Sequence, residues 1–289
     1  MLSPAILKAI DYNIADTVFS YIPNTAETAF FGLIHGLNDW LNEEKKRQII
    51  SAGNNLNDET VEKILNLRVR TEKIAIKDAK IRTFITDDLH RDEMVAHVYD
   101  VTYGVIRKGI DTLVILDDSI VRGTTLKQSI LKILDRLGPK KIIIVSSAPQ
   151  IRYPDCYGID MAKLGDFIAF QAVIALHEDR GSNYIVEEVY EQCIAQDSLS
   201  KEEIRNVVQR IYDAFTPEEI SAKISTLLKP ENIHAEVEII YQSLENLHQA
   251  TPNHSGDWYF SGNYPTPGGN KVVNRAFINY FNKVNERAY

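Results

Sequence analysis

Two adjacent carboxylates, Asp117 and Asp118, follow directly after an apolar run at residues 113–116. An uninterrupted apolar run of this length, bounded by turn residues, predicts a strand that is buried on both faces. Carboxylates at the end of such a strand can hold sugar hydroxyls or a divalent cation. The sequence therefore predicts a polar site at the carboxyl end of this strand.

A short polar turn, residues 119–125, joins the acidic pair to an amphipathic segment. Gly123 lets the backbone approach a ligand closely, and Thr124 or Thr125 can cap a helix. The unpaired N–H groups and the positive dipole end of a helix N-terminus favour a phosphate. One face of the amphipathic segment carries Leu126, Ile130, Leu134 and Leu137. Carboxylates beside a phosphate cradle indicate a ligand that also carries hydroxyls or a cation.

A second strand–turn–helix pattern occurs early in the sequence. Residues 17–22 predict a strand, residues 23–28 a turn, and helical periodicity resumes from Ala29 onward. By itself this pattern is more typical of an ordinary βα turn than of a ligand site. Residues 141–147 predict another buried strand, and the strand–helix–strand order from residue 112 predicts a right-handed parallel unit. Open α/β sheets bind ligands at the carboxyl ends of their strands, which is where these turns are expected.

The string D-D-S-I-V-R-G-T-T at residues 117–125 resembles the phosphoribosyl pyrophosphate (PRPP) motif of type I phosphoribosyltransferases. Together with S-A-P-Q-I-R-Y-P-D-C-Y-G-I-D-M at residues 147–161, it is similar to the synthase half of amidophosphoribosyltransferases. The resemblance covers most of residues 17–175 and a tail near residues 256–268. It implies an α/β fold of the type I phosphoribosyltransferase kind, with a mainly parallel sheet flanked by helices and a helical C-terminal extension.

The resemblance also implies roles for individual residues. It places Asp117, Asp118 and Arg82 in catalysis, and Thr25, Asp117 and Asp118 around a Mg²⁺ ion. It assigns PRPP binding to residues of both turns and of the segment between them: Thr25, Ala26, Ser119, Arg122, Gly123, Thr124, Thr125 and Arg91.

Residues 67–103 carry seven lysine and arginine residues and are poorly periodic, which suits a mobile flap over the phosphates. The string R-T-F-I at residues 82–85 resembles one that the family places here. The family is rich in arginine and lysine beyond this string, whereas this chain carries four acidic residues: Asp87, Asp88, Asp92 and Glu93. Arg82 and Arg91 are therefore the cations expected to contact PRPP, and a solvated charged segment is the alternative for each lysine.

The loop at residues 152–161 lines the site in the family, which makes Arg152, Tyr157 and Asp160 secondary candidates. Pro154 and Gly158 are equally consistent with a loop that does not line a site and only shapes a turn.

The expected domain division is a PRPP-binding phosphoribosyltransferase domain at residues 1–175 and a helical extension packed on it at residues 176–289. Capping boxes that begin at Ser200 and Thr216 predict amphipathic helices near residues 201–214 and 217–228. A further helix is expected over residues 232–248. The tail at residues 256–266 resembles the aromatic terminus of the family, but it lacks the cysteine that ligates a cluster in some relatives. No iron–sulfur cluster is expected.

The reaction implied by the resemblance displaces pyrophosphate from PRPP with ammonia and forms 5-phosphoribosylamine, the first step of de novo purine biosynthesis. The family's glutaminase half uses an N-terminal cysteine, whereas position 2 is Leu and the two cysteines are Cys156 and Cys193. Glutamine hydrolysis by this chain is not expected, so the ammonia would come from solution or from a missing glutaminase domain. An excised fragment is favoured over a natural ammonia-dependent enzyme.

Two alternatives stay open at this point: a salvage phosphoribosyltransferase that uses a nucleobase, and a non-catalytic regulator that senses PRPP. A net charge of −8 argues against a nucleic-acid partner. No apolar run is long enough for a transmembrane helix, and the first residues lack the pattern of a secretory signal. The expected location is cytoplasmic, and the expected partners are PRPP, glutamine-derived ammonia, inhibitory purine nucleotides and further copies of the chain.

Overall fold

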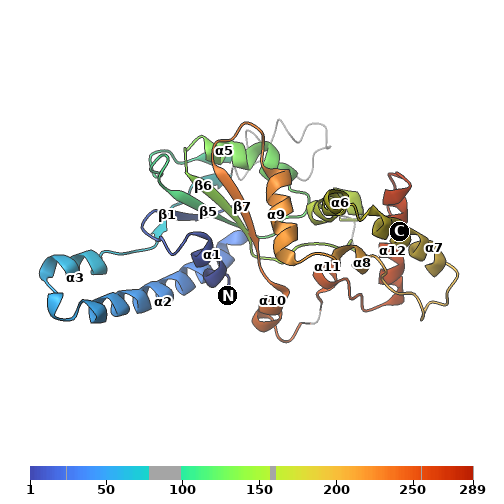
Figure 1. The fold of residues 1–289 in the computed structure, drawn as a ribbon, viewed down its shortest axis with the longest axis horizontal. Coiled ribbons are helices and arrows are strands. Elements are labelled where there is room, and N and C mark those ends of the chain that lie inside the picture. Colours follow the sequence, from blue (N-terminus) through green and yellow to red (C-terminus); the bar gives the residue numbers. More distant parts are fainter. Residues whose placement is uncertain (24, 78–98, 157–160, 255, 289) are drawn as a thin grey trace. The chain divides into compact units, whose positions relative to one another are not determined.

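The computed structural model describes residues 1–23, 25–77, 99–156, 161–254 and 256–288. The chain forms two compact units, and each is built from several separate segments. The first comprises residues 1–118, 125–147 and 230–240, and the second comprises residues 119–124, 148–229 and 241–289. Figure 1 labels most of the helices and strands of both.

The first unit is organised around a five-stranded sheet with the strand order β2-β1-β5-β6-β7. The pairings of β1 with β2, β1 with β5 and β5 with β6 are all parallel. Residues 113–116 of β5 and 142–145 of β6 have no exposed surface, as expected for strands covered on both faces. The bounds of the strands are Thr17–Tyr21 (β1), Arg70–Thr71 (β2), Thr112–Asp117 (β5), Lys141–Ser146 (β6) and Glu236–Tyr241 (β7).

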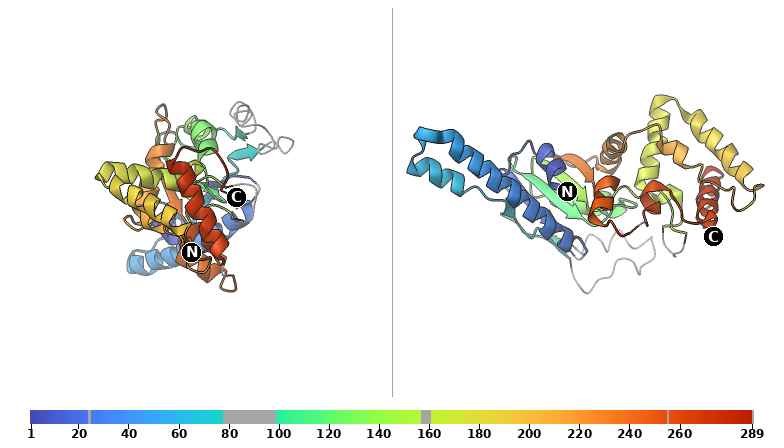
Figure 2. Two further views of the ribbon diagram at one scale, coloured as in Figure 1. Left: turned by 90° about the vertical axis from the view of Figure 1, so that its right-hand side faces the viewer. Right: turned by 90° about the horizontal axis from the view of Figure 1, so that it is seen from below.

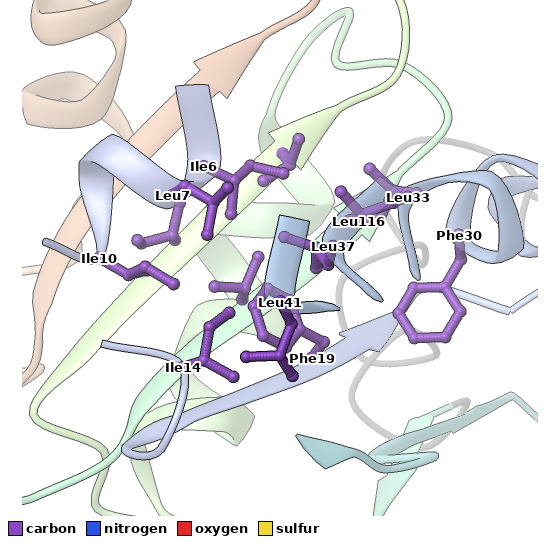
Figure 3. Close-up of a cluster of buried hydrophobic side chains, with 13 residues drawn as sticks. Ile6, Leu7, Ile10, Ile14, Phe19, Phe30, Leu33, Leu37, Leu41 and Leu116 are labelled. Atoms are coloured by element: carbon purple, nitrogen blue, oxygen red, sulfur yellow. The ribbon is translucent and has the colours of Figure 1, made fainter. Parts of the chain in front are cut away.

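Helices α1 (Ser3–Ala9) and α2 (Ala26–Ala52) pack their apolar residues against this sheet. The buried cluster joins Ile6 and Leu7 of α1 to Leu33, Leu37 and Leu41 of α2, and both groups to side chains of β1, β5 and β6 (Figure 3). The regular i, i+4 spacing on α2 explains why one face of so long a helix can stay buried.

The far end of α2 is followed by a 3₁₀ turn, η1 (Gly53–Asn55), and by α3 (Asp58–Leu65), which folds back beside α2 (Figure 2). Lys45 Nζ of α2 donates to the carbonyl of Leu65 at 3.0 Å. The chain then forms β2 and a separate antiparallel pair, β3 (Ala75–Lys77) with β4 (Tyr99–Val101).

Between β5 and β6 the chain forms a π-helical turn, η2 (Leu126–Ile130), and then α5 (Leu131–Asp135). The four apolar residues expected on one face here are all buried: Leu126, Ile130, Leu134 and Leu137. The predicted strand–helix–strand unit with parallel strands is therefore confirmed, as is the α/β class with a mainly parallel sheet.

The second unit is helical in its described part. Helix α6 packs against α9, and α7 packs against α12. Phe170 of α6 meets Phe277 and Tyr280 of α12 edge-on, with ring centroids 6.1 and 4.7 Å apart. The elements are η3 (Leu164–Asp166), α6 (Ile168–Arg180), α7 (Asn183–Gln196), α8 (Gln209–Tyr212), α9 (Pro217–Leu228), α10 (Leu244–Ala250), α11 (Trp258–Ser261) and α12 (Pro267–Phe281).

Three expectations about the second half of the chain need correction. The helix expected near residues 201–214 is only the single turn α8, because Ser200 and Glu203 bond to each other in a turn that does not continue as a helix. The helix expected over residues 232–248 is instead β7 followed by α10, because this segment joins the sheet. The units do not divide at residue 175 either, since residues 148–175 belong to the second unit and residues 230–240 return to the first. In the described part of the chain, no helix is long and apolar enough to cross a membrane.

Candidate active site

The acidic pair lies where the sequence predicts it, at the carboxyl end of β5. The backbone carbonyl of Asp117 accepts a hydrogen bond from the N–H of Ser147 at 2.9 Å, and the carbonyl of Asp118 accepts from the Ser147 hydroxyl at 3.1 Å. The Asp118 N–H donates to Asp117 Oδ1 at 2.9 Å. The end of β6 therefore fixes the backbone that presents both carboxylates.

The turn after β1 reaches the same edge of the sheet. The N–H of Ile22 continues the ladder by donating to the carbonyl of Leu116 at 2.8 Å. The Thr25 hydroxyl then donates to Asp118 Oδ2 at 2.5 Å, across 93 positions of sequence. Thr25 is the N-cap residue of α2, but its hydroxyl does not bond to the first turn of that helix. Because the side chain is directed to the acidic pair instead, the two predicted motifs meet.

A second hydrogen bond joins the two ends of the turn between β1 and α2. The hydroxyl of Tyr21, at the end of β1, donates to Glu27 Oε1 in the first turn of α2 at 2.7 Å. This hydrogen bond and partial burial raise the pKa of Tyr21. Ala26, the first residue of α2, has almost no exposed side chain, so its polar contribution to a ligand is its backbone N–H. Tyr21 and Glu27 are not among the residues predicted for the site, although their positions on either side of a tight turn are visible in the sequence.

Residues 119–124, expected to cradle a phosphate, belong to the second unit. Arg122 Nε lies 3.6 Å from Asp166 Oδ2, and the carbonyl of Val121 accepts from the N–H of Ile168 at 2.8 Å. Gly123 has a φ of +71°, and a Cβ placed there would lie 2.5 Å from a methyl of Leu228. Glycine is therefore required here by the left-handed backbone and by close packing.

Thr125 precedes η2, and its hydroxyl makes no capping bond to that turn. Ser119 and Thr124 remain candidates in the second unit. Two of the predicted cations, Arg82 and Arg91, lie outside the described residues, and so do Tyr157 and Asp160.

Arg152, the remaining secondary candidate, is tied into the second unit. Its Nε and Nη2 donate to Oε1 of the buried Gln150 at 3.2 and 2.7 Å, and its guanidinium lies over the ring of Tyr212. Gln150 in turn donates to the Pro217 carbonyl and to the Ser221 hydroxyl. These contacts favour a structural role for Arg152.

The donor set at the edge of the sheet suits a hard cation. Within the described ranges, no group of three or more His, Cys, Asp or Glu side chains is placed to hold a metal ion. Thr25, Asp117 and Asp118 offer only oxygen atoms, the donor type that Mg²⁺ prefers. Mg²⁺ is commonly bound through one or two carboxylates and completed by substrate phosphates and water, so these residues fit it.

Parts of this chain are similar in sequence to known proteins. No protein-family model matches the chain. It is 50% identical over 58 residues to the amidophosphoribosyltransferase of Pasteurella multocida, a stretch that covers 20% of this chain and 11% of that protein. It is 30% identical over 142 residues to the amidophosphoribosyltransferase of Lachancea kluyveri, covering 46% of this chain and 28% of that protein.

Among solved structures, the chain resembles a glutamine PRPP amidotransferase from B. subtilis complexed with ADP and GMP. The identity is 22% and the TM-score 0.41, with 87% of this chain and 38% of that chain covered. In each of these comparisons the match spans well under half of the known protein's length. The resemblance indicated by the motifs is nevertheless confirmed at the level of sequence: over part of their length, amidophosphoribosyltransferases are similar to this chain.

Proposed function

We propose that the chain carries the synthase chemistry of an amidophosphoribosyltransferase, the displacement of pyrophosphate from C1 of PRPP by ammonia to form 5-phosphoribosylamine. The observation that carries the proposal is the Thr25–Asp118 hydrogen bond. It joins the turn after β1 to the acidic pair after β5 at the carboxyl ends of two neighbouring parallel strands. This is where open α/β sheets bind their ligands, and the parallel sheet with its covering helices supports a type I phosphoribosyltransferase fold.

Each residue group has a distinct task in this proposal. Asp117 and Asp118 hold the ribose hydroxyls or the metal shell, since carboxylates accept hydrogen bonds and bind hard cations. The turn that ends at Thr25 holds the pyrophosphate, with the N-terminus of α2 offering backbone N–H groups and the positive end of its dipole. The turn at residues 119–125 holds the 5-phosphate.

The reaction needs charge stabilisation more than proton transfer. Positive charge develops on the ribose ring while the leaving pyrophosphate becomes more negative, and groups aimed at that charge lower the barrier. Mg²⁺, held by Thr25, Asp117 and Asp118, would stabilise the negative charge of the leaving group electrostatically. The protein's own part is to orient C1 for attack from the face opposite the pyrophosphate.

The proposal includes the partners that the reaction implies. Ammonia is supplied by a glutaminase domain or from solution. Purine nucleotides act as inhibitors, in keeping with the ADP and GMP bound to the B. subtilis protein. The active form is a homo-oligomer in the cytoplasm.

The decisive experiment measures pyrophosphate release from PRPP with Mg²⁺ and ammonium. Thr25→Val removes the donor of the bond between the motifs, and Asp118→Asn removes the charge of its acceptor. Asp39→Asn, at an exposed position of α2, is the matched control. We expect ammonium-dependent release that falls by about 10²-fold or more in Asp118→Asn, the size of effect seen when one charge-stabilising group is lost. The control variant should keep the rate of the unmodified chain.

Further arms of the experiment separate the competing functions. Release that depends on a nucleobase and not on ammonium would replace the proposal with a salvage transferase. PRPP binding by calorimetry without any turnover would replace it with a sensor. If PRPP does not bind and no pyrophosphate is released, a PRPP site at this edge of the sheet is refuted.

A further inference from the structure

A cavity of about 570 Å³ lies in the first unit, beside the segment that leads into β1. Residues 12–15 and the second half of α2 line it. Because these residues precede β1 whereas Thr25 follows it, the cavity is at the amino end of the strand and not at the proposed active site. The volume falls within the range of about 300–1,000 Å³ that is typical of small-molecule sites.

The apolar side of the cavity ends in an aromatic pair. The rings of Tyr12 and Trp40 are 5.8 Å apart between centroids and inclined by 33°, so they form one continuous wall. Tyr12 is 58% exposed, and Trp40 is half-buried. Ile14, a member of the core cluster labelled in Figure 3, and Leu67 complete the apolar lining. An aromatic wall open to solvent offers a stacking surface for a planar ring.

Tyr12 is held in this position by an unusual backbone. Asp11 and Tyr12 both adopt left-handed conformations, with φ of 50° and 58°. Left-handed backbone is unfavourable for residues with a Cβ. The Tyr12 N–H donates to the Leu7 carbonyl at 2.8 Å, and the Tyr12 carbonyl accepts from Ile14 at 3.1 Å. The ring is therefore presented to the cavity by a fixed turn.

The polar rim of the cavity decides the charge of the ligand. Glu44 accepts from Gln48 Nε2 through Oε1 at 3.0 Å, and its Oε2 pairs with Arg47 Nη1 at 2.8 Å. Both oxygens of the carboxylate are thus engaged, and a cationic ligand would have to compete with Arg47. Arg47 itself is 67% exposed. Its guanidinium has five N–H donors on three nitrogens, and the ion pair with Glu44 uses only one of these nitrogens. The nitrogens of Arg47 that this pair does not use are positively charged donors that an acidic group can bind.

We propose that this cavity binds a small aromatic anion, a planar ring that carries a carboxylate or a comparable acidic group. The ring stacks against Tyr12 and Trp40, and the acidic group pairs with Arg47. The site is separate from the proposed active site, because Trp40 lies 14 residues along α2 from Ala26, about 21 Å at 1.5 Å per residue. It does not depend on the transferase function.

The probe for this site is 1-naphthoate, an aromatic ring with one carboxylate. The chain has two tryptophans, so Trp258→Phe leaves Trp40 as the source of the single indole N–H signal in a ¹H–¹⁵N spectrum. We expect that signal to shift saturably with one equivalent of bound naphthoate. The neutral analogue 1-naphthalenemethanol should bind about tenfold more weakly, since it lacks the charge-assisted hydrogen bond.

Two variants in the same background test the role of the guanidinium. Arg47→Gln should weaken naphthoate binding by about tenfold and remove its advantage over the neutral analogue. Lys46→Gln is the matched control, because Lys46 is the neighbouring cation, is 65% exposed and does not line the cavity. It should leave the affinity within about twofold.

Three outcomes would overturn the inference: no saturable shift at millimolar naphthoate, equal affinity for naphthoate and the neutral analogue, or equal losses in the two variants. Far-UV circular dichroism of both variants checks that the helix is retained, so that a loss of binding is assigned to the side chain.

Discussion

Replacing Asp111 with asparagine is expected to destabilise the first unit by an amount that depends on pH. Asp111 immediately precedes β5 and is fully buried. Its Oδ1 and Oδ2 accept from Nη1 and Nη2 of Arg70 at 2.7 and 2.9 Å. They also accept from Arg107, through Nε at 2.9 Å and the backbone N–H at 2.8 Å. Asparagine keeps the shape but loses the charge and presents an N–H₂ group to these donors.

The magnitude follows from the pKa of the carboxyl. Burial alone raises the pKa of Asp111, but the hydrogen bonds from Arg70 and Arg107 outweigh it and lower the pKa from 3.8 to about 2. At 1.36 kcal/mol per pKa unit, this difference corresponds to at most about 2 kcal/mol of unfolding free energy. Arg107 is half-exposed, and solvent screening reduces the expected contribution to about 1–2 kcal/mol.

The sign of the pH dependence is fixed by the lowered pKa. The contribution is complete at neutral pH, above the unfolded value of 3.8, and it is lost as the pH falls towards 2. Asp111→Asn cannot show this loss. The stability difference between the unmodified chain and the variant should therefore be largest at pH 7 and shrink by about 1 kcal/mol at pH 3.

The assay is urea unfolding of Trp258→Phe chains at pH 7, 5 and 3, followed by the fluorescence of Trp40 in the first unit. Asp16→Asn is the matched control, because Asp16 pairs with the same Arg107 at 2.8 Å but is 38% exposed. It should cost less than about 1 kcal/mol. A stability difference for Asp111→Asn that is the same at pH 7 and pH 3 would refute the assignment of the lowered pKa to this cluster.

Three further variants test the packing and the local backbone. Leu37→Ala removes a fully buried side chain from the core cluster and should lower the unfolding free energy by about 2–5 kcal/mol in the same urea assay, whereas an effect below 1 kcal/mol would show that the site is loosely packed. Thr216→Ala breaks the capping box in which Thr216 Oγ1 accepts from the Glu219 N–H and Glu219 accepts from the Thr216 N–H. Thermal unfolding of the second unit should show an unfolding free energy lower by about 1 kcal/mol. An unchanged midpoint would contradict this. Gly123→Ala should cost about 1–2 kcal/mol from its left-handed backbone and more from the contact with Leu228; if Leu228→Ala in the same chain does not restore part of the stability, the close packing is not the cause.

Local patterns in the sequence were sufficient to predict the elements whose defining residues lie close together along the chain. The apolar runs of β5 and β6 predict strands covered on both faces, because nothing polar interrupts them, and both are fully buried. The capping box at Thr216 predicts the start of α9, because its two hydrogen bonds join residues three apart. The acidic pair at residues 117–118 also follows from position alone, since it ends an apolar strand.

Local patterns were not sufficient to predict β7, where a helix was expected. Residues 236–241 lie in a stretch whose mixed apolar and charged residues satisfy a helical period as well as a strand period. Pairing at the edge of the sheet decided between the two, and strand preference depends on such neighbours more than on the residues themselves. Ser200 shows the converse case, in which a correct capping pattern is not followed by a helix.

The sequence by itself determined the buried strands, the α/β class and the residue types at the candidate site. Only the tertiary structure decided which side chains meet: Thr25 with Asp118 across 93 positions, Arg70 with Asp111 across 41, and Tyr12 with Trp40 in the lining of the cavity. The physical reason is that periodicity and capping arise from neighbours along the chain. Ion pairs, stacked rings and cavities form between segments that are brought together only when the sheet and its helices pack.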